Sequence, residues 1–172
     1  NGTSAICIGA TTILTASGGT SYTWNTGFLT SSISVTPTAN TKYTVTASDG
    51  TCTGTQDILI TVNPLPTVTI SDSTICNGGS YTLTASGAST YAWNGSGTGS
   101  TKTVSPATTT TYTVTGTDGN GCTDTEQSIV TVNALPTVSA TNDTICNGDS
   151  YVITAAGAVT FIWDSGETNS TL

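Results

Sequence analysis

The sequence predicts an all-β protein built from tandem β-sandwich repeats of about 70 residues, the last of them incomplete. Three observations support this prediction. The phrase TICNGGSYTLTASGASTYAWN at Thr74–Asn94 returns as TICNGDSYVITAAGAVTFIWD at Thr144–Asp164, and more loosely at Ala5–Asn25. Between turns, short segments alternate apolar and polar residues with a period of two, and helical periodicity is absent. The turns themselves are rich in Asn-Gly and Asp-Gly.

The repeat period divides the chain into three parts. NPLPTV from Asn63 and NALPTV from Asn133 align at a shift of 70 residues. We therefore expect a first repeat over 1–63 that lacks its opening strand, a complete repeat over 64–133 and a partial repeat over 134–172. Proline fixes its own φ and restrains the residue before it. The Leu-Pro junctions are therefore expected to hold neighbouring repeats in line.

Each repeat is expected to contain several short antiparallel strands, because its apolar segments are rich in β-branched residues and are bounded by turns. The predicted strands include KYTVTA (42–47), ILITVN (58–63), TVTIS (67–71), YTLTA (81–85) and TYTVTG (111–116).

Cysteines recur at matching places. Cys7 and Cys52 lie 45 residues apart, and Cys76 and Cys122 lie 46 apart. We predict the disulfides Cys7–Cys52 and Cys76–Cys122, with the partner of Cys146 outside this segment. Zinc sites need clustered Cys or Cys/His sets, which this sequence does not offer. Disulfides in turn predict a location outside the cytoplasm.

A tryptophan follows the first cysteine of each repeat by 17 residues, at Trp24, Trp93 and Trp163. An indole is the largest apolar group that a small core can bury, so we expect these residues in the sandwich cores. A sugar-stacking aromatic platform is the alternative.

The charge pattern excludes several classes of function. The net charge is −8, with only Lys42 and Lys102 as basic residues, so neither nucleic acid nor insertion into a membrane is expected. His is absent, which removes Ser-His-Asp and Cys-His catalysis. Asp124 and Glu126 are a carboxylate pair, but the first repeat has Gly54 and Gln56 at these places. We expect a solvated strand edge and no enzyme.

The sequence offers candidates for a calcium site and for covalent glycans. Asp118, Asn120 and Asp124 offer oxygen atoms for calcium, but the first repeat keeps only Asp49, so a turn without a cofactor is expected. Covalent glycans are expected on exposed acceptors. The candidates are Ser73 and Thr144 in Asp-Ser/Thr triplets, and the sequon residues Asn1, Asn94, Asn142 and Asn169.

The phrases TICNGxSYxLTASG, YxWNxG, TTTYTVTGTDGNGC and TVNALPTV resemble the Ig-like or PKD-like repeats of very large Bacteroidota surface adhesins and secreted, gliding-associated proteins. The resemblance covers essentially the whole chain. It implies Ig-like sandwiches that serve as stalks and spacers at the cell surface. It also implies that Ser73 and Thr144 are O-glycosylation sites. Tyr43 and Tyr112 are placed similarly to the tyrosine corner of Ig-like sandwiches.

These observations predict a non-catalytic, glycosylated structural segment of an extracellular adhesin stalk or filament, assembled end to end. The third repeat is completed either by continuation of the chain or by strands of a neighbouring copy. Surface glycans or other cells are the possible further partners. The alternatives are a carbohydrate-binding module and an accessory region of a secreted hydrolase.

Overall fold

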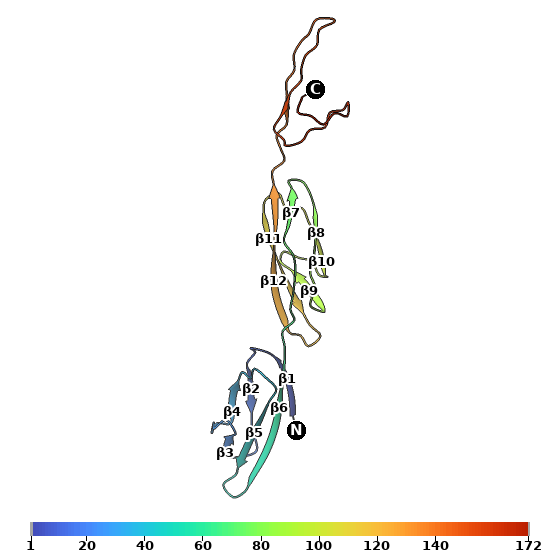
Figure 1. Cartoon of the computed structure of the whole chain (residues 1–172). Helices are drawn as coiled ribbons and strands as arrows, with labels where there is room; N and C mark the ends of the chain where they lie inside the picture. The colour runs from blue at the N-terminus through green and yellow to red at the C-terminus, as the bar shows by residue number, and fades with distance from the viewer. Residues whose placement is uncertain (1, 172) are drawn as a thin grey trace.

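The computed structural model describes residues 2–171, and its regular elements are all β-strands. Figure 1 shows an elongated molecule in which three units follow one another along one axis. Two of the units are sandwiches, and the third consists of open loops with two short strand pieces. The prediction of an all-β protein with tandem Ig-like β-sandwiches is confirmed.

The first sandwich pairs a four-stranded sheet with a two-stranded sheet. The larger sheet has the order β1-β6-β5-β3, and the smaller one pairs β2 with β4. The bounds are β1 Gly2–Cys7, β2 Thr12–Thr15, β3 Ser21–Trp24, β4 Ser32–Val35, β5 Thr41–Ser48 and β6 Thr53–Asn63.

The second sandwich repeats this topology. Its larger sheet has the order β7-β12-β11-β9, and its smaller sheet pairs β10 with β8. The bounds are β7 Ser73–Cys76, β8 Tyr81–Thr84, β9 Thr90–Trp93, β10 Thr101–Val104, β11 Thr110–Thr117 and β12 Thr123–Asn133.

Two strand pairs differ from the antiparallel arrangement that we expected. β1 pairs with β6 in parallel, with Cys7 opposite Asn63, and β7 pairs with β12 in parallel, with Cys76 opposite Asn133. Alternation along a strand specifies which side chains face the core, but it does not specify the direction of the neighbouring strand. These parallel pairs place the first cysteine of each sandwich beside the end of its last strand, from which the linker to the next unit begins.

The predicted strand TVTIS (67–71) is also not a regular strand. The segment runs beside the loop after β8 and makes a single antiparallel bridge there, between Thr69 and Ser86. Pro64 and Pro66 just before it cannot donate backbone hydrogen bonds, so this part of the segment contributes little to a ladder.

Each sandwich has one apolar core, and the tryptophan is part of it. Trp24 is 3% exposed and Trp93 is 5% exposed. Their indole N–H groups donate to the carbonyl oxygens of Thr30 and Gly99, both at 2.9 Å. Each buried indole N–H therefore has a hydrogen-bond partner. The prediction that Trp24 and Trp93 pack in the sandwich cores is confirmed, and the alternative of a sugar-stacking platform does not apply to them.

Tyr43 and Tyr112 do not form the predicted tyrosine corner. Tyr43 is buried in the first core, and Tyr112 packs against the second. The hydroxyl that returns to upstream backbone belongs instead to the tyrosine two residues before Trp24 and before Trp93. Tyr22 donates to the Gly19 carbonyl at 2.8 Å, and its counterpart Tyr91 makes the same bond to Ala88.

Over residues 134–171, the strands of the third unit are β13 (Ser139–Ala140) and β14 (Ala155–Ala156). Trp163 is half-buried, and its indole donates to the Asn169 carbonyl at 2.8 Å. Val138 is 59% exposed, whereas Val68 at the same place in the second sandwich is 3% exposed. The opening segment of this unit therefore presents apolar side chains to solvent.

Candidate functional site at the junction between repeats

The junction begins where β1 and β6 end side by side. The N–H of Ile8 donates to the Asn63 carbonyl at 2.8 Å, which closes this end of the first sheet. The linker from Pro64 then leads into the second sandwich. There, the turn between β11 and β12 carries Cys122, which is fully buried.

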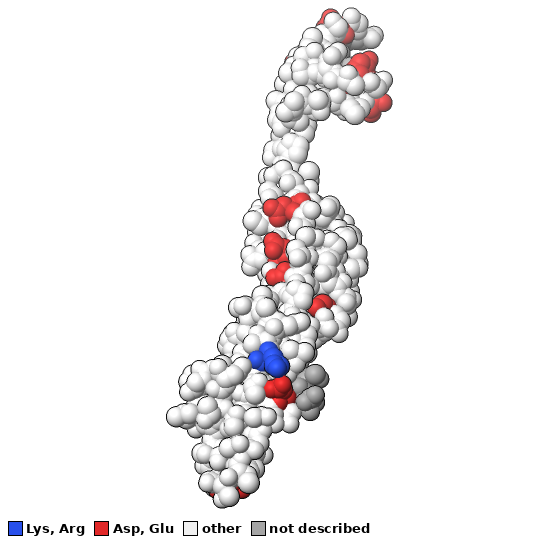
Figure 2. Space-filling view, turned by 60° about the horizontal axis from the view of Figure 1, so that its bottom comes forward, with Lys and Arg blue, Asp and Glu red and all other residues white. Residues whose placement is uncertain are grey.

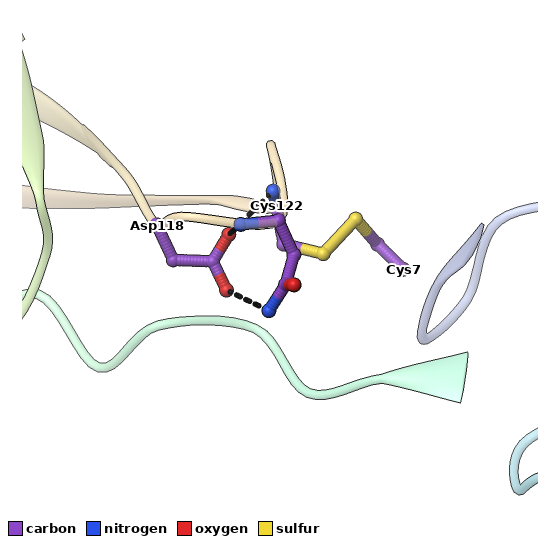
Figure 3. Close-up of a disulfide and its surroundings, with 4 residues drawn as sticks. Cys7, Asp118 and Cys122 are labelled. Atoms are coloured by element: carbon purple, nitrogen blue, oxygen red, sulfur yellow. Dashed lines mark hydrogen bonds between the residues drawn. A yellow bond between two sulfur atoms is a disulfide. The ribbon is translucent and has the colours of Figure 1, made fainter. Parts of the chain in front are cut away.

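A disulfide crosses this junction and joins Cys7 to Cys122. The two Cα atoms lie 5.5 Å apart, and the residues are separated by 115 positions in the sequence. Figure 3 shows Cys7 arriving from the first sandwich on one side of Cys122, with Asp118 on the other side. The bond therefore closes a covalent loop through most of both sandwiches.

The predicted pairs Cys7–Cys52 and Cys76–Cys122 are wrong in this structure. Cys7 lies opposite Asn63 at the end of β6, whereas Cys52 directly precedes the start of the same strand. Eleven residues of β6 separate these ends, a distance of roughly 35 Å at about 3.3 Å per residue. A disulfide needs Cα atoms within about 7 Å. Cys76 and Cys122 lie at the two ends of β12 in the same way.

The turn that presents Cys122 is organised by Asp118. One oxygen of its carboxylate accepts hydrogen bonds from the backbone N–H groups of Cys122 and Asn120, both at 2.8 Å. These bonds, with that of Cys122 as the largest cause, lower the pKa of Asp118 below its ordinary value of 3.8. The charged carboxylate thereby fixes the backbone on which the disulfide is built (Figure 3).

The first sandwich builds the same turn around Cys52. Asp49 Oδ1 accepts from the backbone N–H groups of Thr51 at 2.8 Å and Cys52 at 2.7 Å. The Cys52 N–H is the largest cause that lowers the pKa of Asp49. Cys52 is nevertheless an exposed free thiol, as are Cys76 and Cys146.

The carboxylate oxygens of two calcium candidates, Asp118 and Asp124, accept hydrogen bonds from backbone N–H groups. Asp118 holds its own turn, and Asp124 Oδ2 accepts from the Val68 N–H at 3.0 Å. Within residues 2–171, no group of three or more His, Cys, Asp or Glu side chains could hold a metal ion. Glu126 is exposed two residues further along β12, on the same face of the strand as Asp124.

The glycosylation candidates differ in accessibility. Thr144 and Asn142 are exposed, whereas Ser73 is half-buried in β7, opposite Val130 of β12. Asn94 is exposed, but its side-chain oxygen accepts from the Thr113 N–H at 3.1 Å. Asn169 is exposed in the third unit, and Asn1 lies outside the described residues.

The surface carries little positive charge. Figure 2 shows acidic side chains scattered along the length of the molecule. Lys42 forms an ion pair with Asp57 at 3.2 Å, with both side chains substantially exposed. Lys102 donates to the carbonyl oxygens of Asn94 and Ser96. In the described part of the chain, no helix is long and apolar enough to cross a membrane.

No protein-family model matches the chain, and no curated protein matches it. Solved structures of tandem Ig domains do resemble it. The four N-terminal Ig domains of Dscam1 isoform 1.9 are 8% identical, with a TM-score of 0.34, over 77% of this chain and 43% of that one. A chimeric titin Z1Z2 tandem is 15% identical, with a TM-score of 0.34, over 77% and 95%.

Extracellular domains 3–5 of Drosophila OTK are 12% identical, with a TM-score of 0.35, over 90% of this chain and 71% of that one. The chain spans less than half of the Dscam1 fragment. At these scores the likenesses carry no argument about function, and the Ig-like class rests on the strand topology described above.

Proposed function

We propose that the chain is a non-catalytic structural segment of an extracellular adhesin stalk or filament, in which Ig-like repeats are assembled end to end. The observation that carries this proposal is the Cys7–Cys122 disulfide. It ties two consecutive sandwiches across their junction, so that the Leu-Pro linker is not their only covalent connection. The resemblance of the repeat phrases to Bacteroidota surface proteins supports the same role.

The disulfide also limits how far the chain extends under tension. Cys7 and Cys122 are 115 positions apart, and the residues between them lie within one covalent loop. At about 3.3–3.6 Å per residue, the intact disulfide keeps roughly 400 Å of chain from being extended when the sandwiches unfold under tension. A stalk built in this way resists lengthening even after its noncovalent structure is lost. Disulfides persist in oxidising compartments, which supports an extracellular location.

The carbohydrate-binding alternative has less support. The aromatic side chains that would stack on sugars, Trp24 and Trp93, are buried in the cores. Nor does the structure add an observation in favour of an accessory region of a hydrolase. We keep surface glycans and other cells as possible partners of the whole assembly.

Single-molecule force spectroscopy tests the structural role. The chain is held by its two ends and stretched before and after reduction. The extension of the fully unfolded chain is expected to be shorter by roughly 400 Å before reduction. The Cys7→Ser variant is expected to behave like the reduced chain, and Cys146→Ser like the untreated one. Equal extensions with and without reductant would contradict the proposal.

Covalent glycans are part of the proposed surface role. Of the two O-site candidates, Thr144 is exposed and Ser73 is half-buried within a strand pair. We therefore expect Thr144 to carry more modification than Ser73 in glycopeptides from the native source. Of the sequons, we keep Asn94, Asn142 and Asn169 as acceptors, and Asn1 as an expectation from sequence alone.

A further inference from the structure

The junction disulfide joins the end of one strand to the start of another. Cys7 is the last residue of β1, and Cys122 directly precedes Thr123, the first residue of β12. β1 runs toward the junction, because it is parallel to β6 and ends opposite Asn63, where the linker begins. β12 runs away from the junction. Figure 1 shows both strands lying along the length of the molecule.

These two strands and the bond form one continuous covalent line. β1 contributes six residues and β12 eleven, which gives a line of roughly 60 Å at about 3.3 Å per residue. A β-strand is already close to the full extension of the backbone, so tension lengthens it little. The disulfide adds a short step, since the Cα atoms of Cys7 and Cys122 lie 5.5 Å apart.

The backbone between the two cysteines is a second path between the same points, but it is slack. Fully extended it would span roughly 400 Å, yet the bond holds its two ends 5.5 Å apart, measured between the Cα atoms. A slack path in parallel with a taut one carries no tension. Strands β2 to β6 of the first sandwich and β7 to β11 of the second lie on this slack path.

We infer that tension along the molecule passes through β1, the Cys7–Cys122 bond and β12, and that both cores stay folded under load while the bond is intact. This inference rests on the proposed role as a stalk and goes beyond the limit on extension, which holds for folded and unfolded cores alike. Side chains and glycans on the sandwich surfaces then keep their arrangement when the stalk is pulled.

Reduction moves the load onto hydrogen bonds. Without the disulfide, tension enters the first sandwich through β1 and leaves it at Asn63, the end of β6. These neighbouring strands are parallel, so the pull shears the ladder between them. The second sandwich is loaded in the same way between β7 and β12. Both cores are then held against the load by noncovalent bonds alone, and each unfolds when its ladder breaks.

The disulfide can be cleaved from the side of Cys7, which is half-buried, whereas Cys122 is fully buried. A thiolate of dithiothreitol attacks the Cys7 sulfur, and Cys122 leaves as a thiolate that takes up a proton. The second thiol of the reductant then displaces Cys7. Two cysteine thiols form, and the reductant is oxidised to its cyclic disulfide.

The test holds the full 172-residue chain by its two ends, after mass spectrometry has confirmed the Cys7–Cys122 bond. The force is constant and is one at which the Cys7→Ser variant unfolds within seconds. Dithiothreitol is then added. Cores that were folded until cleavage should lengthen the chain in two separate, delayed steps, one for each sandwich, which together release roughly 400 Å. Cores that were already unfolded would release this length in a single step at cleavage.

A pair of matched variants identifies the delayed steps. Ile60 is fully buried in the first core, whereas Ile13 on β2 is 70% exposed. Ile60→Val should shorten the delay before one of the two steps by at least about twofold, because it removes a buried methyl group. Ile13→Val makes the same change at the surface and should leave both delays unchanged. Cys7→Ser should show both steps as soon as the force is applied, without reductant.

The outcomes separate this inference from the proposed function. A single step at cleavage overturns the inference alone, because the bond would still have limited the extension. Equal delays in Ile60→Val and the parent chain overturn it as well, since the delayed step would then not be the unfolding of the first core. A chain that does not lengthen at all on reduction would count against the proposed function.

Discussion

Trp93 and Trp163 occupy the same place in their repeats but have different surroundings. Trp93 is 5% exposed within a closed core, whereas Trp163 is half-buried in the open third unit. The spacing of 17 residues from cysteine to tryptophan identified the core residue of a sandwich correctly at Trp24 and Trp93. Burial, however, depends on the strands that close over the indole, and within residues 2–171 these strands occur only in the first two units.

The tryptophan pair gives a direct prediction. Trp93→Ala should lower the free energy of unfolding of the second sandwich by about 3–5 kcal/mol, because it leaves a large cavity. Trp163→Ala should cost much less. Urea unfolding followed by circular dichroism measures both. An equal loss in the two variants would contradict the assignment of Trp93 to a closed core.

Asp118 makes the junction turn sensitive to acid. The N–H of Cys122 is the largest cause that lowers its pKa in the folded state below 3.8. The stabilisation from this carboxylate is therefore complete above pH 3.8 and is lost as the pH falls through the lowered value. Asp118→Asn should melt at a lower temperature than the parent chain at neutral pH, and the gap should close in acid. The melting temperatures of both chains across this range test it.

At the scale of elements, the sequence predicted sandwiches and turns well but missed strand direction. Alternation in ILITVN identified β6, yet nothing in that pattern indicates that β1 runs parallel to it. The disulfide prediction failed for this reason. Equal spacing of cysteines in two repeats fits bonds within repeats and bonds between neighbours equally well, and only the parallel pairing distinguishes them.

The contact between β11 and the loop before β9 allows a compensating exchange. Gly116→Ala should destabilise the second sandwich by about 1–3 kcal/mol, because its Cβ would crowd Val68 and Ala88. Adding Ala88→Gly recreates the Gly19 and Ala47 combination of the first sandwich and should recover part of the loss. A double-mutant cycle measures the coupling. Strict additivity would show that the two sandwiches do not use this exchange.

At the scale of the whole molecule, the Cys7–Cys122 disulfide forms a covalent clamp between neighbouring sandwiches. The sandwiches are small, and small domains bury a limited fraction of their surface. The disulfide between them adds a covalent link at their junction. The elongated arrangement in Figure 1 and the exposed cysteines at equivalent positions fit an assembly that continues by the same type of junction.

The most direct measurement is a disulfide map of the oxidised chain by mass spectrometry under non-reducing conditions. The account predicts a peptide pair that joins Cys7 to Cys122, with Cys52 absent from any bond to Cys7. Peptide pairs that join Cys7 to Cys52 and Cys76 to Cys122 would show that the disulfides lie within repeats, and would contradict the clamp.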